Sequence, residues 1–272
     1  VTSLTVAHIT PVSIASGKTL SGAITVTAGS IKLGEAGTLA STVAMSGGTL
    51  DADNSLTLSG ALTQTGAITI DVAEDKTLSY SGDEISLGAN TLTMSGEGTF
   101  SNTNDLDLNN ASSKLLLSSS ITVGSVSTSA DNSGLDVDAD NSTVSSLTVA
   151  HTTPVSIASG KTLSGAITVT AGSVKLDETG TLASSVSMSG GTLDADETLT
   201  LSGALSQSGA ITIDVADGKT LTYSGASLSL GANTLTLSGG GTLVSGGLDL
   251  NNASSKLLLN SITVDNVSTS LA

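Results

Sequence analysis

The sequence predicts an all-β protein that folds as a parallel β-solenoid, in which the chain winds into stacked coils of short strands. Three observations support this prediction: a short repeat of strand-like segments, a longer tandem repeat that contains it, and a composition poor in helix formers. The 272 residues include 31 Gly and no Arg, and Val, Ile, Leu and Thr are abundant. Such a composition favours short strands that are joined by tight turns.

Short alternating runs recur along each half of the chain. Ile24–Thr27, Leu56–Leu58 and Ile68–Ile70 place aliphatic side chains on one side of an extended segment and Thr on the other. Ser-Gly, Gly-Gly and Asp-Asn pairs separate these runs. Counted from Leu20 to Leu92, the runs start on average every ~18 residues, which predicts ~18-residue coils and about 15 coils in the chain.

A longer repeat spans about half of the chain. Ser3–His8 returns as Ser146–His151, and most of the positions that follow match at the same offset of 143 residues. We therefore divide the chain into a first repeat, residues 1–143, and a truncated second repeat, residues 144–272. The coils are expected to continue from one repeat into the next, and the two repeats to be a window of a longer tandem array.

Tandem immunoglobulin-like sandwiches are the alternative architecture. A repeat of 143 residues is long for one such domain, and its strands would be unusually short. A narrow solenoid interior leaves little room for rings, and the only aromatic residues are Tyr80, Phe100 and Tyr223. These features favour the solenoid over the sandwich.

The composition excludes several classes of partner. With 24 acidic residues and 8 Lys the net charge is −16, so a nucleic acid would be repelled, and three rings are too few for base stacking. No apolar run is long enough for a transmembrane helix, so we expect no membrane insertion. Cysteine is absent, which removes disulfides and thiolate chemistry. Acidic, Ser/Thr-rich repeats without Cys are typical of bacterial secreted or surface proteins, so we expect an extracellular location.

The densest acidic cluster lies at the junction of the two repeats and contains Asp136, Asp138 and Asp140. In an extended strand these carboxylates would point to one side, where Ca²⁺ could relieve their mutual repulsion. The spacing does not fit an EF-hand, because Leu147 occupies the twelfth position. A solvated polar turn is the alternative interpretation. No cofactor is expected to be required, and Ca²⁺ is the one candidate.

Other candidate groups give weaker signals. Three acidic pairs follow the same alternation: Asp51/Asp53, Asp194/Asp196 and Asp105/Asp107. His8 and His151 occupy one repeat position with no carboxylate nearby in sequence, which indicates turn residues. A lyase would need a strong base such as Arg, and a glycosidase would need paired carboxylates in a groove with aromatic sugar platforms. Since every feature here is duplicated, we expect no enzymatic activity.

Thr-x-Thr pairs raise an ice-binding hypothesis, because a Thr array at strand spacing can order surface water. The pairs are Thr25/Thr27, Thr91/Thr93, Thr198/Thr200 and Thr220/Thr222. However, Thr63 and Thr65 become Ser206 and Ser208 in the second repeat, which favours ordinary solvent-facing positions. A single face with Thr at every coil would favour ice binding instead.

The segment Gly231–Leu243 resembles the repeats of bacterial autotransporter passengers and giant secreted adhesins. Gly88–Thr99 resembles them too, with Met94 and Glu97 as departures. The resemblance implies a parallel β-helix at the cell surface that is used for reach, adhesion or fibre assembly. It supplies no catalytic residues.

These observations predict a non-catalytic structural segment of a long extracellular bacterial β-solenoid, such as a stalk, an adhesin shaft, a surface filament or a biofilm matrix fibre. We expect self-association along or beside the fibre, because an open solenoid end exposes unpaired strand edges. Contacts with cell surfaces or glycans would be weak and multivalent. The alternative is an adhesive module that itself binds glycan, Ca²⁺ or ice.

Overall fold

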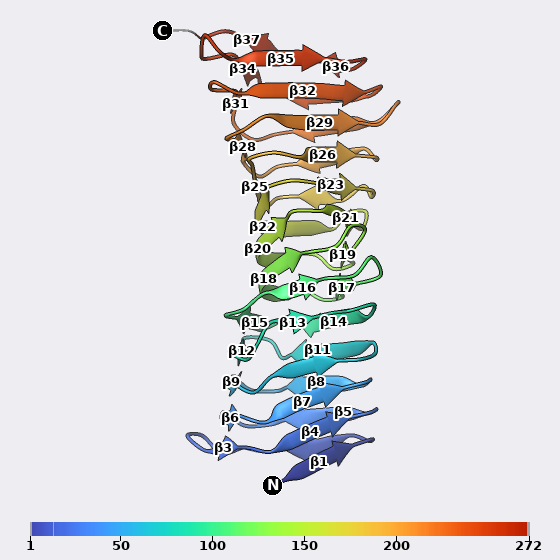
Figure 1. Ribbon diagram of the computed structural model, residues 1–272, viewed down its shortest axis with the longest axis vertical. Coiled ribbons are helices and arrows are strands. Elements are labelled where there is room, and N and C mark those ends of the chain that lie inside the picture. The colour runs from blue at the N-terminus through green and yellow to red at the C-terminus, as the bar shows by residue number, and fades with distance from the viewer. Residues whose placement is uncertain (1, 13, 271–272) are drawn as a thin grey trace. The chain divides into compact units, whose positions relative to one another are not determined.

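The chain folds as an all-β parallel β-solenoid of about 13 turns, each about 20 residues long. The computed structural model in Figure 1 describes residues 2–12 and 14–270, and these residues contain no helix. The described residues therefore hold no helix of the length and apolarity needed to cross a bilayer. The predicted solenoid is confirmed, and the alternative of tandem sandwiches is wrong because the strand pairs are parallel.

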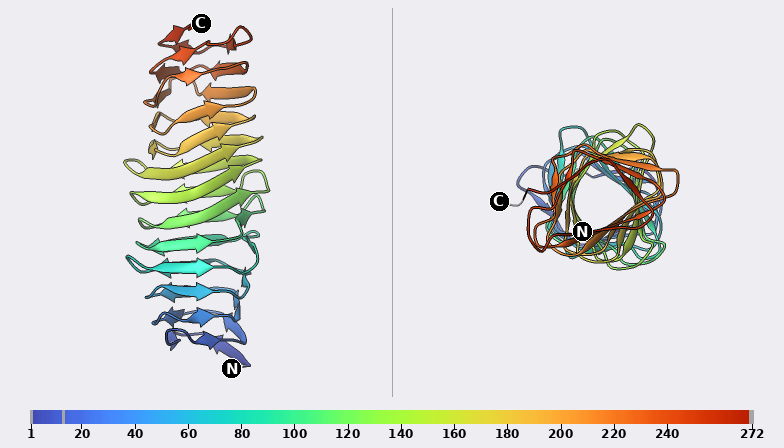
Figure 2. Two further views of the ribbon diagram at one scale, coloured as in Figure 1. Left: turned by 90° about the vertical axis from the view of Figure 1, so that its left-hand side faces the viewer. Right: turned by 90° about the horizontal axis from the view of Figure 1, so that it is seen from above.

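The chain divides into two compact units, Val1–Ser145 and Ser146–Ala272. Within each unit a typical turn contributes three short strands, which we assign to a first, a second and a third parallel sheet. Some strands bend across a corner and serve both the third and the first sheet. The stacking of turns within each unit can be followed in Figure 2.

In the first unit the strands are distributed as follows. The first sheet contains β1 (Ser3–Val6), β4 (Ala23–Val26), β7 (Thr42–Met45) and β10 (Leu62–Gln64), followed on the same side by β13 (Ile85–Ser86) and β16 (Leu106–Leu108). The second contains β2 (Thr10–Val12), β5 (Ser30–Leu33), β8 (Thr49–Ala52), β11 (Ile68–Val72), β14 (Thr91–Gly96), β17 (Lys114–Leu117) and β19 (Gly134–Val137). The third contains β3 (Thr19–Leu20), β6 (Thr38–Leu39), β9 (Leu56–Leu58), β12 (Thr77–Tyr80), β15 (Thr99–Asn102) and β18 (Thr122–Thr128). β20 (Ser142–Val149) contains the division between the units.

The second unit repeats this arrangement. Its second sheet contains β21 (Thr152–Ile157), β23 (Ser173–Leu176), β26 (Thr192–Ala195), β29 (Ile211–Val215), β32 (Thr234–Gly239) and β35 (Lys256–Leu259). Its third contains β22 (Thr162–Val169), β24 (Thr181–Leu182), β27 (Leu199–Leu201), β30 (Thr220–Tyr223), β33 (Thr242–Ser245) and β36 (Thr263–Val264). β22 extends into the first sheet beside β25 (Ser185–Met188) and β28 (Leu205–Gln207), and β31 (Leu228–Ser229), β34 (Leu248–Asp249) and β37 (Val267–Ser268) form a ladder of their own.

The observed turns are longer than the predicted ~18 residues. Leu20 pairs with Leu39, and Leu39 with Leu58, as the spacing of the short repeat suggests. Leu78, however, pairs with Phe100, whereas Leu92 lies in the second sheet. The sequence count used Leu92 as the next start and so mistook a strand of another sheet for a new turn. The count of about 15 coils was too high for the same reason.

Alternation of buried and outward residues along most strands creates the core. Ile68, Ile70 and Val72 of β11 are buried, while Thr69 and Asp71 between them are half-buried and face outward. Because the pairing is parallel and in register, each inward side chain lies between like side chains of the turns before and after it. Burial of one large aliphatic side chain contributes about 1.5–3 kcal/mol. The hydrophobic core therefore extends through every turn of a unit.

The interior also holds the aromatic residues, contrary to the expectation that rings would not fit. Tyr80 and Phe100 are buried and stack with their ring centroids 6.1 Å apart. The Tyr80 hydroxyl accepts a hydrogen bond from the amide of Leu62 at 3.1 Å and donates one to the carbonyl of Asp83 at 2.6 Å. The tyrosine ring fits inside because its hydroxyl hydrogen-bonds to backbone groups at a corner, and Phe100 stacks against it in the next turn.

Glycine is required where the chain leaves the second sheet at two equivalent positions. Gly96 has φ of +83° and Gly239 has φ of +105°, in the region that side chains rarely adopt. A Cβ atom at either position would lie 1.9 Å from a carbonyl oxygen of the preceding turn, that of Val72 or Val215. The turn-to-turn spacing therefore excludes any side chain there.

We predict that Leu78→Ala lowers the free energy of unfolding by about 2–5 kcal/mol, because Leu78 is fully buried between Leu56 and Phe100. Leu258→Ala is the control, since Leu258 is 41% exposed, and should cost less than about 1 kcal/mol. Urea denaturation followed by circular dichroism measures both. Equal losses for the two variants would contradict the stacked core.

Candidate functional site

The outward side of the third sheet carries a Thr on every strand of the first unit. In-register pairing aligns these residues into two columns that run from turn to turn. One column contains Thr19, Thr38, Thr57, Ser79 and Ser101, and the other contains Thr77, Thr99 and Thr122. The inward residues between them, such as Leu78 and Phe100, belong to the core.

The second unit has the same two columns on its own third sheet. One contains Thr162, Thr181, Thr200, Thr222 and Val244, and the other contains Thr220, Thr242 and Thr263. Val244 is the one apolar member of these columns and is exposed. We call the two columns of each unit its threonine face.

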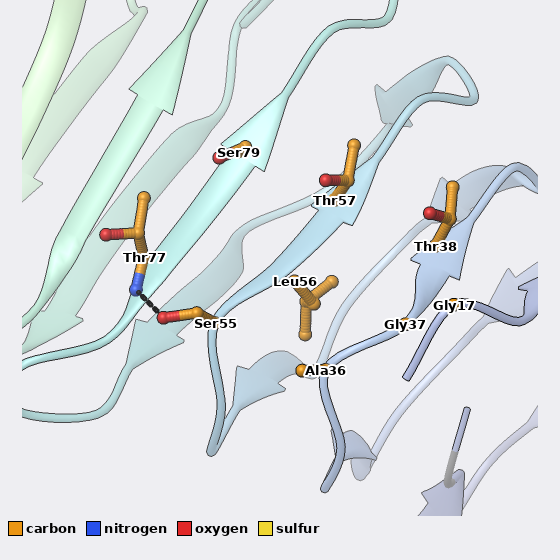
Figure 3. Close-up of a pocket in the computed structure, with 9 residues that line it drawn as sticks. All are labelled: Gly17, Ala36, Gly37, Thr38, Ser55, Leu56, Thr57, Thr77 and Ser79. Carbon is orange, nitrogen blue, oxygen red and sulfur yellow. Dashed lines mark hydrogen bonds between the residues drawn. The ribbon is translucent and has the colours of Figure 1, made fainter. Parts of the chain in front are cut away.

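Figure 3 shows how the threonine face of the first unit presents its side chains. Thr38, Thr57 and Thr77 project from neighbouring strands with their methyl and hydroxyl groups in the same orientation. A shallow depression of about 290 Å³ lies over these strands, and small residues such as Gly17 and Gly37 line part of it. The amide of Thr77 donates a hydrogen bond to the Ser55 hydroxyl at 3.0 Å, which ties adjacent turns together at the corner.

The second sheet presents charges instead. In the first unit Lys32 pairs with Asp51 and Asp53 of the next turn, with Nζ to Oδ2 distances of 3.3 and 2.8 Å. Asp71 follows Asp51 in register and accepts a hydrogen bond from the hydroxyl of Ser95. In the second unit Lys175, Asp194 and Asp196 repeat the ion-pair group. The acidic pairs at 51/53 and 194/196 therefore hold a lysine ammonium in each unit.

Stacking carboxylates in register has an electrostatic cost. Burial raises the pKa of Asp51 above its usual 3.8, and the neighbouring charges of Asp53 and Asp71 raise it further, while Lys32 lowers it. Burial also raises the pKa of Asp194, with Asp196 and Asp214 adding to the effect and Lys175 opposing it. Both carboxyl groups therefore lose part of their hydration on folding without full compensation from the lysine.

The predicted calcium ligands do not converge on one point. Asp136 lies in β19 and pairs with Lys114 of the preceding turn. The strand ends at Val137, so Asp138 follows the strand and Asp140 lies in a turn, where its carbonyl accepts a hydrogen bond from Ser120 at 2.6 Å. Among the described residues, no three His, Asp or Glu side chains are grouped so that they could hold a metal ion. Ca²⁺ at this junction stays a prediction.

The third acidic pair is split between two environments. Asp107 is buried in β16 and accepts a hydrogen bond from the Ser129 hydroxyl at 2.6 Å. Asp105 precedes the strand, and its carbonyl accepts a hydrogen bond from the amide of Ile85 at 3.1 Å. Asp107 thus acts as a structural acceptor that links two turns.

His8 and His151 lie in bends, as their sequence context predicts. The backbone of each is approached closely by a glycine of the next turn, Gly29 or Gly172, whose absent Cβ would lie 2.4 Å from the histidine carbonyl carbon. A side chain at either glycine would clash with the histidine backbone, so the close packing of successive turns at this corner requires glycine. Neither histidine belongs to a metal-binding group within the described chain.

The sequence motif Thr-x-Thr was a poor guide to the threonine face. Thr91/Thr93 lies on the second sheet and Thr25 on the first, whereas Thr220/Thr222 lies on the third. Thr19, Thr38 and Thr57 were missed, because each is the only Thr on the outward side of its short strand. The parallel register is the signal that would have found them.

No protein-family model matches this sequence, and no curated protein or solved structure was found to be similar to it. The resemblance to autotransporter passengers and adhesins therefore rests on the short segments 88–99 and 231–243 alone.

We predict that stability increases as the pH falls from 7 towards the raised pKa values of Asp51 and Asp194. A carboxyl whose pKa is higher in the folded state binds its proton more tightly there than in the unfolded chain, so its ionised form lowers stability at neutral pH. The urea midpoint should therefore be higher at about pH 4, near the ordinary pKa of an Asp carboxyl, than at pH 7. In the double variant Asp51→Asn/Asp194→Asn this rise in the urea midpoint should be smaller. In the control Asp217→Asn, which changes an exposed residue, the rise should be as large as in the wild type. An unchanged gain in the double variant would contradict this explanation.

We also predict that excess EDTA leaves the thermal midpoint unchanged, because Lys114 already neutralises Asp136. Differential scanning calorimetry with and without added Ca²⁺ provides the measurement. A Ca²⁺-dependent rise in the midpoint that Asp138→Asn abolishes would instead establish the junction as a calcium site.

Proposed function

We propose that the chain is a non-catalytic structural segment of an extracellular bacterial β-solenoid, such as the shaft of a surface filament or adhesin, or part of a matrix fibre. The observation that supports this proposal most directly is the continuity of backbone pairing within each unit. Turn after turn, each strand of the second sheet donates and accepts main-chain hydrogen bonds in register. Such a ladder resists extension because many hydrogen bonds share a load.

The polar groups inside each unit also serve the ladder. The side-chain amide of Gln64 donates to the carbonyl of Leu87, and Gln207 donates to Leu230 in the same way, both at 3.1 Å. The Tyr223 hydroxyl accepts from the amide of Leu205 at 3.2 Å, as Tyr80 does in the first unit. These repeated contacts support a scaffold, since an active site is normally unique within a chain.

Self-association along the fibre is part of this proposal. Each turn within a unit pairs with the turns before and after it, as β17 does with β14 and β19. The same parallel pairing can join one copy of the repeat to another, because a strand edge that no turn covers offers its amide and carbonyl groups to a second chain. Lateral association beside the fibre, and weak multivalent contacts with cell surfaces or glycans, complete the proposed role.

The extracellular location is proposed from composition. A net charge of −16 and a Ser/Thr-rich exterior keep a repetitive chain hydrated, and the absence of Cys makes the fold independent of the redox environment. The resemblance of 231–243 to adhesin repeats agrees with this location.

A register-preserving deletion tests the structural role. Deleting residues 19–161 joins Lys18 to Thr162, which takes the place of Thr19 at the start of a third-sheet strand. We predict that the shortened chain still folds cooperatively. Within a fibre the deletion should remove about seven turns of about 4.8 Å, or about 34 Å of length, as measured by atomic force microscopy.

The matched control removes ten fewer residues. Deleting residues 19–151 joins Lys18 to Thr152, so a second-sheet strand would follow where a third-sheet strand belongs. This variant should lose turns of structure, which is visible as a lower cooperativity of urea unfolding. If both deletions fold equally well, or if the first one abolishes the fibre, the modular scaffold is wrong.

A further inference from the structure

We propose that the threonine face of each unit binds ice. This inference goes beyond the structural role and does not depend on it, because a fibre segment could have any hydrated exterior. Its basis is a two-dimensional array of Thr and Ser hydroxyl groups, interrupted by Val244, that only the folded register creates. The Thr residues come from separate turns and lie in line because their strands pair residue for residue.

The spacing of the array is fixed in both directions by the sheet. Along the stack the side chains repeat at the strand separation of about 4.8 Å, and along a strand alternate residues such as Thr220 and Thr222 lie about 6.7 Å apart. Main-chain hydrogen bonds hold this grid, for example from the amide of Thr38 to the carbonyl of Lys18 at 2.9 Å. A crystalline surface repeats in two dimensions, so a fixed grid can contact many of its sites at once.

Threonine suits such a contact because its side chain has both a hydroxyl and a methyl group. Its hydroxyl hydrogen-bonds to water, while its methyl group favours water that is ordered around it. The branched Cβ restricts χ1, so neighbouring Thr side chains keep one orientation at little entropic cost. Thr38, Thr57 and Thr77 show this common orientation (Figure 3).

Charge distinguishes this face from the second sheet. Among the described residues, the outward positions of the third-sheet strands carry no charged side chain, whereas the second sheet carries Lys32, Asp51 and Asp71. Charged groups hold their own hydration shells strongly and would oppose an ice-like arrangement of water. The first sheet is uncharged on its outward side from β1 to β10 as well, but β13, β25 and β28 carry Ser there and no Thr. The third sheet is therefore the side of each unit that combines neutral strands with a Thr on every strand.

The Ser-for-Thr exchanges that spoke against ice binding lie elsewhere. Thr63 of β10 and its counterpart Ser206 of β28 belong to the first sheet. On the third sheet the exchange runs in the other direction, since Ser79 of the first unit corresponds to Thr222 of the second. The criterion of a face with Thr at every coil is therefore met within each unit.

A crystalline polysaccharide is the other flat, hydroxyl-bearing surface to consider. Aromatic platforms usually provide such contacts, and here Tyr80, Phe100 and Tyr223 are all buried. With no ring on the threonine face, the observations favour ice.

Ice-affinity partitioning of the fluorescently labelled full chain tests the proposal, with serum albumin as the inert reference. We expect the wild type to enter slowly grown ice and to inhibit ice recrystallisation at micromolar concentration. Thr57→Lys/Thr200→Lys places a charge at the same position of both threonine faces and should lower the ice-bound fraction at least tenfold.

The matched control carries the same substitution on the second sheet. Thr69→Lys/Thr212→Lys also changes two equivalent outward residues and should partition into ice like the wild type. Urea midpoints show whether each variant is folded. If Thr57→Lys/Thr200→Lys fails to fold, the milder Thr57→Ser/Thr200→Ser takes its place and should bind ice more weakly.

Three results would overturn the proposal. The wild type could be excluded from ice as albumin is, the two lysine variants could lose ice binding equally, or the chain could bind crystalline cellulose or chitin while ignoring ice. The first and third outcomes leave the structural role untouched, because the deletion experiment tests that role separately.

Discussion

The structure depends on one interaction, the parallel, in-register hydrogen-bond ladder between successive turns. Within each unit the amide of one turn bonds to the carbonyl of the turn before, as Thr57 does to Gly37 at 3.2 Å and Thr99 to Lys76 at 2.8 Å. Because the register is kept, each residue lies above its equivalent in the previous turn. Side chains of similar type therefore stack on one another from turn to turn, both in the core and on the surface. Each residue must be compatible with the residues directly above and below it.

The same constraint produces both stabilising and destabilising columns. Aliphatic columns bury their side chains completely, as at Leu50, Ile70 and Met94, and stabilise each unit. A column of carboxylates is unfavourable, and the chain relieves it by placing Lys32 before Asp51 and a Ser95 hydroxyl beside Asp71. Columns of Thr carry no such cost. The exterior of each unit therefore has a charged second sheet and a neutral third sheet, and the third sheet, with Thr on every strand, is the surface that we propose to bind ice.

The sequence sufficed to predict the fold class, because alternation and tandem repetition are local signals that survive without coordinates. It did not predict the turn length, since Leu92 has the same local pattern as Leu78 although it lies in another sheet. It also missed the pairing of Asp136 with Lys114, which belong to different turns. The threonine face was invisible for the same reason: Thr19, Thr38 and Thr57 become neighbours only through the register.

Distance measurement between spin labels tests the ladder most directly, and the absence of Cys allows two labels to be placed without background. Ser30, Thr49, Thr69, Thr93, Leu116 and Asp136 form one outward column of the first unit. Labels at Ser30→Cys and Leu116→Cys span four turns and should lie about 19 Å apart, and moving the second label to Asp136→Cys should add about 5 Å. Double electron–electron resonance that finds this increment supports the in-register solenoid. A separation that does not grow by one strand spacing would contradict it.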